Sequence, residues 1–215
     1  MTKKTPTPEA VVDVPGLRTI RRGNLRCVIA DLNVGGVCLY SPVEKTSAAF
    51  PQTDDVRYLF APNHYHNKGI AEHAKAFQNA QLVSSNAARP RLEKVTGCRF
   101  GDLSGLRQAL PDCVSLAEPE GLKTGEVWMI VRAGAEIVWV VTDTFYGLLE
   151  KDDARARPGF LKTFPTYGLK DKQRFSDWVR QRLAEEVPTM IVPCHGETVR
   201  GAALDREIDA LLETL

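Results

Sequence analysis

Two consecutive apolar segments constrain the fold of this chain more than any other feature. Residues 126–132 (EVWMIVR) and 136–142 (EIVWVVT) are rich in Val, Ile and Trp, which favour strands, and RAGAE between them is typical of a tight turn. The second segment is apolar on both faces, as is typical of a strand that is covered on both sides of a sheet. We therefore predict a strand pair whose second member lies in the centre of a sheet.

Other segments predict a mixed order of strands and helices. Short apolar runs predict strands over 25–30, 36–40, 56–61, 81–84 and 189–192, and periodic patterns predict helices over 70–77, from Asp102, over 172–186 and over 202–215. Asn33 and the pair Gly35-Gly36 lie between the first two strands and indicate a hairpin. This order is typical of a layered α/β protein.

Domain organisation follows from length and local composition. At 215 residues, one compact domain over residues 16–215 is expected, preceded by a flexible tail over residues 1–15 that is rich in Lys, Thr and Pro. Residues 145–170 mix aromatic and basic side chains without clear periodicity and are predicted to form an insertion or lid rather than core.

Charge and hydropathy exclude several classes of protein. The formal net charge of +1 argues against a nucleic-acid-binding role, and no apolar run is long enough for a transmembrane helix. The N-terminal residues lack the apolar core of a signal peptide, so a cytoplasmic chain is expected. Five scattered cysteines without a C-x-x-C pair favour neither a disulfide framework nor a cysteine zinc site.

Common catalytic motifs are missing. The sequence has no G-x-G-x-x-G after its first strand, no Walker A sequence and no G-x-S-x-G, so dinucleotide, P-loop and serine-hydrolase functions lack their basic requirement.

Candidate metal ligands follow three of the predicted strands. His64 and His66 occur in APNHYHNKG, Asp143 follows the strand at 136–142, and His195 follows the strand at 189–192. An H-x-H pair in a loop can direct two imidazoles at one ion, and neutral imidazole suits zinc. Four such residues at the ends of three strands predict a metal site. His73 is expected to be an ordinary surface or helix residue.

The chain resembles the metallo-β-lactamase-like superfamily, and in particular a divergent branch of it. The resemblance runs from GGVCLYSPV through VRYLFAPNHYHNKGI and the strand pair EVWMIVRAGAEIVWVVTD to TMIVPCHGE, over roughly residues 20 to 200. It implies a four-layer αβ/βα sandwich with metal ions at the lip between two sheets.

Four of the seven ligand positions that the resemblance implies are retained. His64 and His66 match the first two positions of H-x-H-x-D-H, Asp143 matches the bridging aspartate and His195 the last histidine. Lys68 stands where the motif has aspartate, Gly69 where it has the next histidine, and Leu122 near the position of a further histidine. The resemblance thus implies at most one divalent metal, zinc being favoured.

Lys68 bears directly on that metal chemistry. An ammonium within ~4 Å of a divalent cation repels it strongly in a cleft of low dielectric. Lys68 could also supply a positive charge of its own and form a salt bridge with Asp143. The aspartate that it replaces normally orients the attacking water, so Lys68 and Asp143 are the candidate catalytic residues here.

Two functions remain open from the sequence. The first is a hydrolase with one metal ion held by His64, His66, Asp143 and His195, acting on a small molecule that the sequence does not identify. The second is a metal-free binding or interaction module on the same scaffold, with Lys68 paired to Asp143. No nucleic acid or membrane is expected as a partner, and the oligomeric state is left open.

Overall fold

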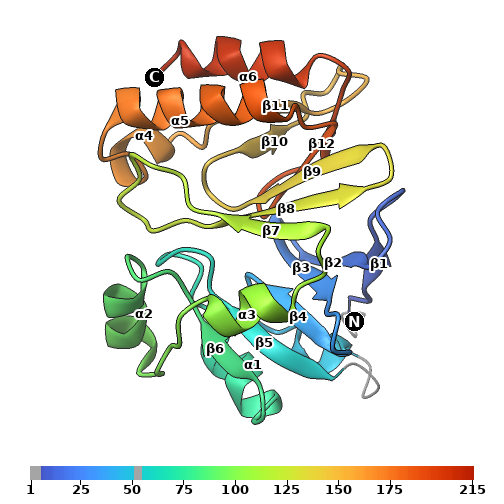
Figure 1. Cartoon of the computed structure of the whole chain (residues 1–215), viewed down its shortest axis with the longest axis vertical. Helices are drawn as coiled ribbons and strands as arrows, with labels where there is room; N and C mark the ends of the chain where they lie inside the picture. The colour runs from blue at the N-terminus through green and yellow to red at the C-terminus, as the bar shows by residue number, and fades with distance from the viewer. Residues whose placement is uncertain (1–5, 51–54) are drawn as a thin grey trace. The chain divides into compact units, whose positions relative to one another are not determined.

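The computed structural model describes residues 6–50 and 55–215. The chain forms two compact units, Met1–Asp112 and Cys113–Leu215. Each unit has one main sheet with helices packed on it (Figure 1). The single domain over residues 16–215 stays a prediction.

The sheet of the first unit has six strands in sequence order. Its strands are β1 (Glu9–Ala10), β2 (Leu17–Arg22), β3 (Leu25–Asp31), β4 (Val37–Tyr40), β5 (Val56–Phe60) and β6 (Gln81–Val83). The first four pair antiparallel, and β4, β5 and β6 pair parallel. The hairpin predicted around Gly35-Gly36 is confirmed: both glycines adopt φ +77°, and Val28 of β3 faces Tyr40 of β4.

Short helices cover the sheet of the first unit. They are the 3₁₀ turn η1 (Ser47–Ala49), α1 (Ile70–Ala76), α2 (Arg89–Thr96) and α3 (Ser104–Ala109). Helix α2 has Pro90 in its first turn and ends at Gly97 in the left-handed region, a common start and stop. Ala74 of α1 and Phe77, which directly follows the helix, pack against a core that includes Leu39 and Leu59.

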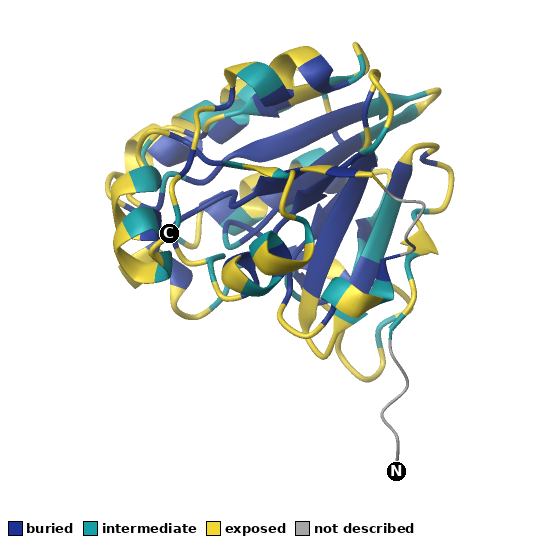
Figure 2. Ribbon diagram, turned by 90° about the horizontal axis from the view of Figure 1, so that it is seen from below, coloured by how far each residue is buried: buried dark blue, intermediate teal, exposed yellow. Residues whose placement is uncertain are grey.

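The second unit has a five-stranded sheet and a separate two-stranded one. The larger has the order β13-β12-β9-β8-β7, formed by β7 (Val114–Ala117), β8 (Trp128–Ala133), β9 (Glu136–Val141), β12 (Met190–Pro193) and β13 (Val199–Arg200). As predicted, β9 is central: it pairs antiparallel with β8 and parallel with β12. Its residues from Val138 to Val141 are buried, and the central strands of both units are mainly buried in Figure 2.

Two long helices lie side by side on one side of this sheet (Figure 1). Helix α5 (Lys172–Glu185) begins after Asp171, whose carboxylate accepts a hydrogen bond from the Arg174 amide at 3.0 Å, and α6 (Leu204–Leu212) follows β13. Phe175 and Val179 of α5 are buried in the core, with Trp178 and Leu183 packed against it. The predicted apolar face of this helix is therefore confirmed.

The prediction that residues 145–170 form an insertion or lid is wrong. This segment contains β10 (Tyr146–Leu148), β11 (Arg157–Gly159) and α4 (Phe164–Tyr167), and Phe145 and Phe164 are buried in the core of the second unit. The ring of Phe160 stacks on both phenylalanines, with centroid distances of 5.9 and 5.2 Å. The aromatic side chains of this segment are thus core residues.

The N-terminal segment is partly paired. Glu9 faces Thr19 and Ala10 faces Arg18 of β2, and Val14 is buried. Residues 1–5 of the predicted tail lie outside the described residues. In the described ranges, none of the helices combines the length and the hydropathy needed to cross a membrane.

Candidate functional site

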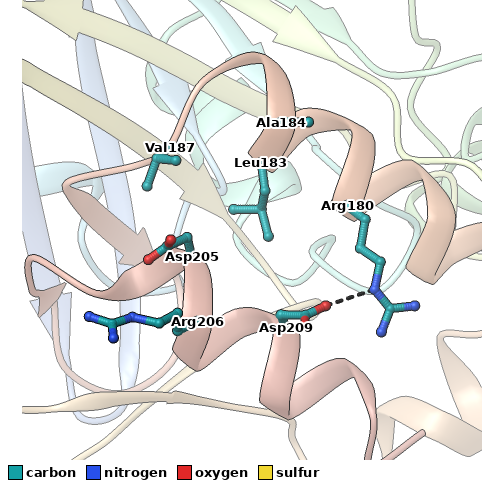
Figure 3. A pocket seen from close by; sticks show the side chains of 7 residues that line it. All are labelled: Arg180, Leu183, Ala184, Val187, Asp205, Arg206 and Asp209. Atoms are coloured by element: carbon teal, nitrogen blue, oxygen red, sulfur yellow. Dashed lines mark hydrogen bonds and ion pairs between the residues drawn. The ribbon is translucent and has the colours of Figure 1, made fainter.

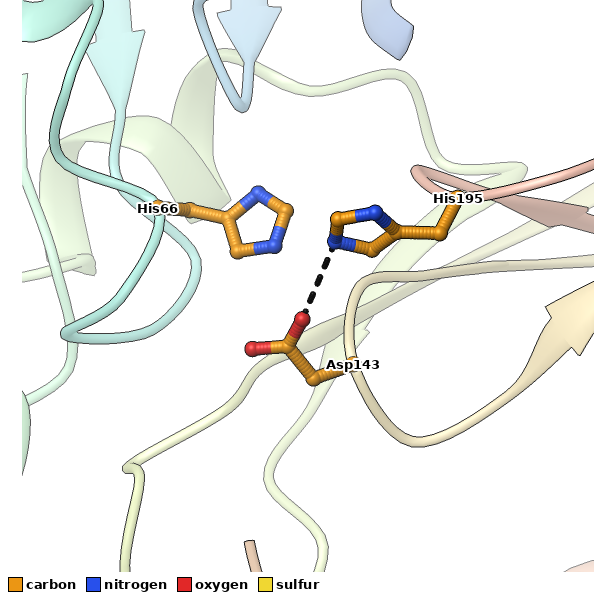
Figure 4. Close-up of side chains that lie close together, drawn as sticks. All are labelled: His66, Asp143 and His195. Atoms are coloured by element: carbon orange, nitrogen blue, oxygen red, sulfur yellow. Dashed lines mark ion pairs between the residues drawn. The ribbon is translucent and has the colours of Figure 1, made fainter. Parts of the chain in front are cut away.

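The side chains of Asp143 and His195 contact each other at one edge of the second sheet. Strands β9 and β12 are parallel neighbours that end at Val141 and Pro193, which face each other in the register. Each site residue lies two positions beyond its strand, so both loops leave from the same edge. His195 Nε2 lies 3.1 Å from Asp143 Oδ1, and the two side chains are 20% and 17% exposed (Figure 4).

The turn that carries His195 depends on two glycines. Gly147 donates from its amide to the His195 carbonyl at 3.2 Å and accepts from the Glu197 amide at 3.0 Å. Gly196 has φ +76°, and a Cβ there would lie 2.4 Å from the Gly147 carbonyl oxygen. Only glycine fits such a close backbone approach at positive φ, so the main chain fixes the direction of His195.

Glu126 holds the backbone at the candidate site and was not predicted from the sequence. It is buried, and its carboxylate accepts from the amides of Thr142 at 3.0 Å, Asp143 at 3.1 Å and Thr144 at 3.4 Å. Burial and the nearby Asp143 carboxylate raise the pKa of Glu126, against the opposing hydrogen bonds from the two threonines. Glu126 thereby holds the backbone on which Asp143 sits.

The predicted histidine pair lies in the first unit, in the loop after β5. The Asn63 side chain shapes this loop: its Oδ1 accepts from the amides of Tyr65 at 2.7 Å and His66 at 3.0 Å. His64 is buried and its ring lies edge-on to that of Tyr65, with 4.3 Å between centroids. His66 is half-buried, and its Nδ1 lies 2.6 Å from Ser41 Oγ.

Of the three positions that depart from the motif, Gly69 and Leu122 have local explanations. Lys68 is exposed in the same loop. At Gly69 a Cβ would lie 2.2 Å from the Pro42 carbonyl oxygen, so this backbone has no room for any side chain. Leu122 packs against the core of the second unit and bridges to Leu169. Neither Gly69 nor Leu122 offers a ligand atom, and the residues do not fit a second metal ion.

His73 is helical as predicted, but it is not a surface residue. It is fully buried in α1, with Nδ1 2.9 Å from the Gly69 carbonyl oxygen and Nε2 3.3 Å from Thr46 Oγ1. Burial lowers the pKa of His73, although the bond to Gly69 and the charge of Glu72 oppose this effect. The residue joins the helix to the loop after β4.

The candidate ligand atoms suit one metal ion of intermediate softness, such as zinc. His66, Asp143 and His195 each offer one ligand atom, two imidazole nitrogens and one carboxylate oxygen, which is a set that zinc accepts. Within the second unit, Asp143 and His195 already converge without an ion (Figure 4). The roles of His64 and Lys68 at this site stay predictions.

A separate groove of about 320 Å³ lies between α5 and α6 (Figure 3). Its wall includes the Arg180–Asp209 ion pair, with 2.7 Å between Nε and Oδ1, and the side chains of Leu183 and Val187. It contains none of the predicted site residues.

Solved structures similar to this chain include metallo-β-lactamases and a flavoprotein fragment. The metallo-β-lactamase FIM-1 from Pseudomonas aeruginosa, in its mono-zinc form, has a TM-score of 0.63 at 12% identity, over 100% of this chain and 97% of that one. A metallo-β-lactamase from Pontibacter korlensis gives 0.58 at 13%, over 97% and 100%. The fragment of a diflavin flavoprotein from Nostoc sp. PCC 7120 gives 0.63 at 11%, over 98% of each chain.

These similarities define the fold. The chain has the α/β fold of these metallo-β-lactamase structures, as the sequence resemblance predicts. No family model matches the sequence. No curated protein matches it either.

Proposed function

We propose that this protein is a metal-dependent hydrolase that binds one divalent ion, with zinc as the favoured metal. The observation that carries the proposal is the Asp143–His195 pair, which brings a carboxylate oxygen and an imidazole nitrogen to 3.1 Å at the ends of parallel strands. His66 of the first unit is the proposed third ligand, because its ring is already oriented by Ser41. His64 remains the fourth predicted ligand.

A bound zinc ion would polarise a carbonyl or phosphoryl oxygen and lower the pKa of a water molecule at this site. Asp143 and His195 would bind the ion. Glu126 would keep the Asp143 backbone in place through its hydrogen bonds to three amides. Lys68 is the proposed source of a positive charge near an anionic substrate or transition state. Esters, thioesters, lactones, amides and phosphoesters are the substrate classes to test.

Strong β-lactamase activity is not expected. Lys68, Gly69 and Leu122 stand where the family motif has metal ligands. The backbone at Gly69 has no room for a side chain, and the Leu122 side chain packs in the core and has no ligand atom. The similarity to the mono-zinc form of FIM-1 supports a one-metal site on this fold.

The same replacements favour a second candidate function. A metal-free binding module would keep the fold and use Lys68 and the Asp143–His195 pair for charge interactions with a ligand. Such a protein would bind its partner without turning it over.

A reducing location and a small-molecule partner complete the proposal. All five cysteines are free thiols, which supports a cytoplasmic location. The net charge of +1 does not favour nucleic acid or a membrane surface as a partner.

Metal content of the untagged, chelator-free protein tests the proposal directly. Elemental analysis is made before and after zinc supplementation and desalting, on the wild type, His66→Ala and His64→Gln. Near-stoichiometric zinc that is lost in His66→Ala supports the one-metal hydrolase, and its loss in His64→Gln adds His64 as a ligand. No metal above background in either wild-type preparation excludes the hydrolase and leaves the binding module.

A further inference from the structure

Ser41 has an unusual backbone conformation for a buried serine. It follows β4 directly, its side chain is 3% exposed and its φ is +59°. A left-handed conformation is uncommon outside glycine, asparagine and aspartate. The two other non-glycine residues with positive φ in the described part of the chain, Asp13 and Lys45, are exposed turn residues. Ser41 therefore differs from them in being held inside the protein.

The left-handed turn directs the Ser41 hydroxyl to the His66 ring. Oγ lies 2.6 Å from Nδ1, and the Ser41 amide donates to the Phe60 carbonyl at 2.9 Å, which ties the turn to the end of β5. The His66 amide is fixed independently by Asn63. Both partners of the Ser41–His66 contact thus have an anchored main chain.

The loop after Ser41 contacts helix α1 and the residue before the helix at several points. Pro42 abuts Gly69 so closely that no Cβ would fit between them. The Glu72 carboxylate accepts from the amides of Lys45 at 2.5 Å and Ser47 at 3.1 Å. These contacts keep Ser41 in a conformation that costs about 1 kcal/mol or more, and such strain is concentrated at functional sites.

We propose that Ser41 is a positioning residue for His66: its hydroxyl accepts a hydrogen bond from Nδ1–H and thereby commits Nε2 to metal coordination. This inference deepens the proposed function and rests on it. A histidine ligand ordinarily donates its second ring N–H to a neighbouring acceptor, which fixes both the tautomer and the ring orientation. Ser41 is the acceptor that the geometry provides.

Two substitutions separate the hydroxyl from the backbone conformation. Ser41→Gly removes the hydroxyl and adopts positive φ without strain, whereas Ser41→Ala removes the hydroxyl and keeps the strain. Lys45→Gly is the matched control, because it replaces another left-handed residue of the same loop and retains the amide that Glu72 binds.

Zinc affinity, measured by competition with a chromophoric chelator, is the first readout. We expect Ser41→Gly and Ser41→Ala to bind zinc about 10- to 100-fold more weakly than the wild type, as for other partners of metal-bound histidines. Lys45→Gly should keep the wild-type affinity. A Ser41→Gly protein that melts no lower than the wild type and binds zinc within twofold of it overturns the proposal.

The imidazole ¹⁵N shifts of the metal-free, full-length protein are the second readout. We expect neutral His66 to be a single Nδ1–H tautomer in the wild type and a mixture in Ser41→Gly; identical shifts in the two proteins overturn the role of Ser41. If the wild type binds no zinc and the tautomer still depends on Ser41, the proposed hydrolase fails while the positioning of His66 stands.

Discussion

The carbonyl oxygen of Pro42 occupies the space that any side chain at Gly69 would need, 2.2 Å from the position of its Cβ. Gly69 precedes α1, and its carbonyl oxygen accepts hydrogen bonds from His73, so the helix start and the loop after β4 are in direct contact here. The loss of a ligand at this position is therefore built into the backbone and not only into the residue type.

Gly69→Ala should destabilise the protein by about 2 kcal/mol or more, because a new methyl group would overlap backbone atoms that cannot move away cheaply. Gly69→His should be destabilised at least as much and should not bind a second zinc ion. Urea unfolding and zinc titration check the two statements. Gly101→Ala is the control, since its nearest neighbour would lie 3.7 Å away. Equal stability of the two alanine variants would contradict the packing argument.

His73 should make the protein less stable as the pH falls. Burial lowers its pKa, so the unfolded chain takes up a proton near the ordinary histidine pKa of about 6.5 while the folded chain resists it. The stability that neutral His73 contributes is fully present above about pH 6.5 and is lost as the pH falls through the lowered value, at up to about 1.4 kcal/mol per pH unit.

His73→Gln should flatten that dependence, because glutamine is polar at this buried position and does not titrate. Urea unfolding of both proteins between about pH 5 and pH 8 checks this prediction. The groups that contact His73 include Thr46, Gly69, Phe50, Phe77 and Glu72, and of these five only Glu72 carries a titratable side chain. Parallel curves for wild type and variant would show that another group titrates.

Glu126→Gln should weaken both the second unit and the candidate site. A glutamine side chain has one acceptor oxygen, whereas the Glu126 carboxylate binds three amides with two, so at least one buried N–H loses its partner. That loss costs about 1–3 kcal/mol. Thermal unfolding measures it, and the exposed Glu150→Gln variant should stay within about 0.5 kcal/mol of the wild type. Equal melting of the two variants would contradict the role of Glu126.

Regular periodicity made much of the secondary structure predictable. Three elements are each defined by a pattern that spans only a few residues. They are the hairpin at Gly35-Gly36, the central strand that precedes Asp143 and the apolar face of α5. The strand-end positions of Asp143 and His195 follow from the same pattern, because polar residues directly after buried strands lie at a sheet edge.

The parts that were missed depend on contacts between distant residues. Phe160 stacks on both Phe145 and Phe164, and Phe145 lies 15 residues before Phe160, so no local period identifies them as core. Glu126 opens an apolar run like any polar residue, yet its partners lie 16 to 18 residues further on. Nothing in the local sequence predicts the positive φ of Ser41. That conformation is held by the contacts between the loop after Ser41 and helix α1.

Lys68→Asp tests whether the lysine of the H-x-H loop opposes metal binding. Lys68 is exposed two residues after His66, and its positive charge acts on a divalent ion through solvent, where attraction and repulsion are weakened. Reversal of that charge should raise zinc affinity by about three- to tenfold at low salt, and the gain should shrink as ionic strength shortens the Debye length.

Lys75→Asp, at another exposed lysine of the first unit, is the matched control and should change the affinity less. Competition titrations at two salt concentrations measure both variants. If Lys68→Asp and Lys75→Asp shift zinc affinity equally, the effect belongs to the overall charge of the unit and Lys68 has no special role at the site.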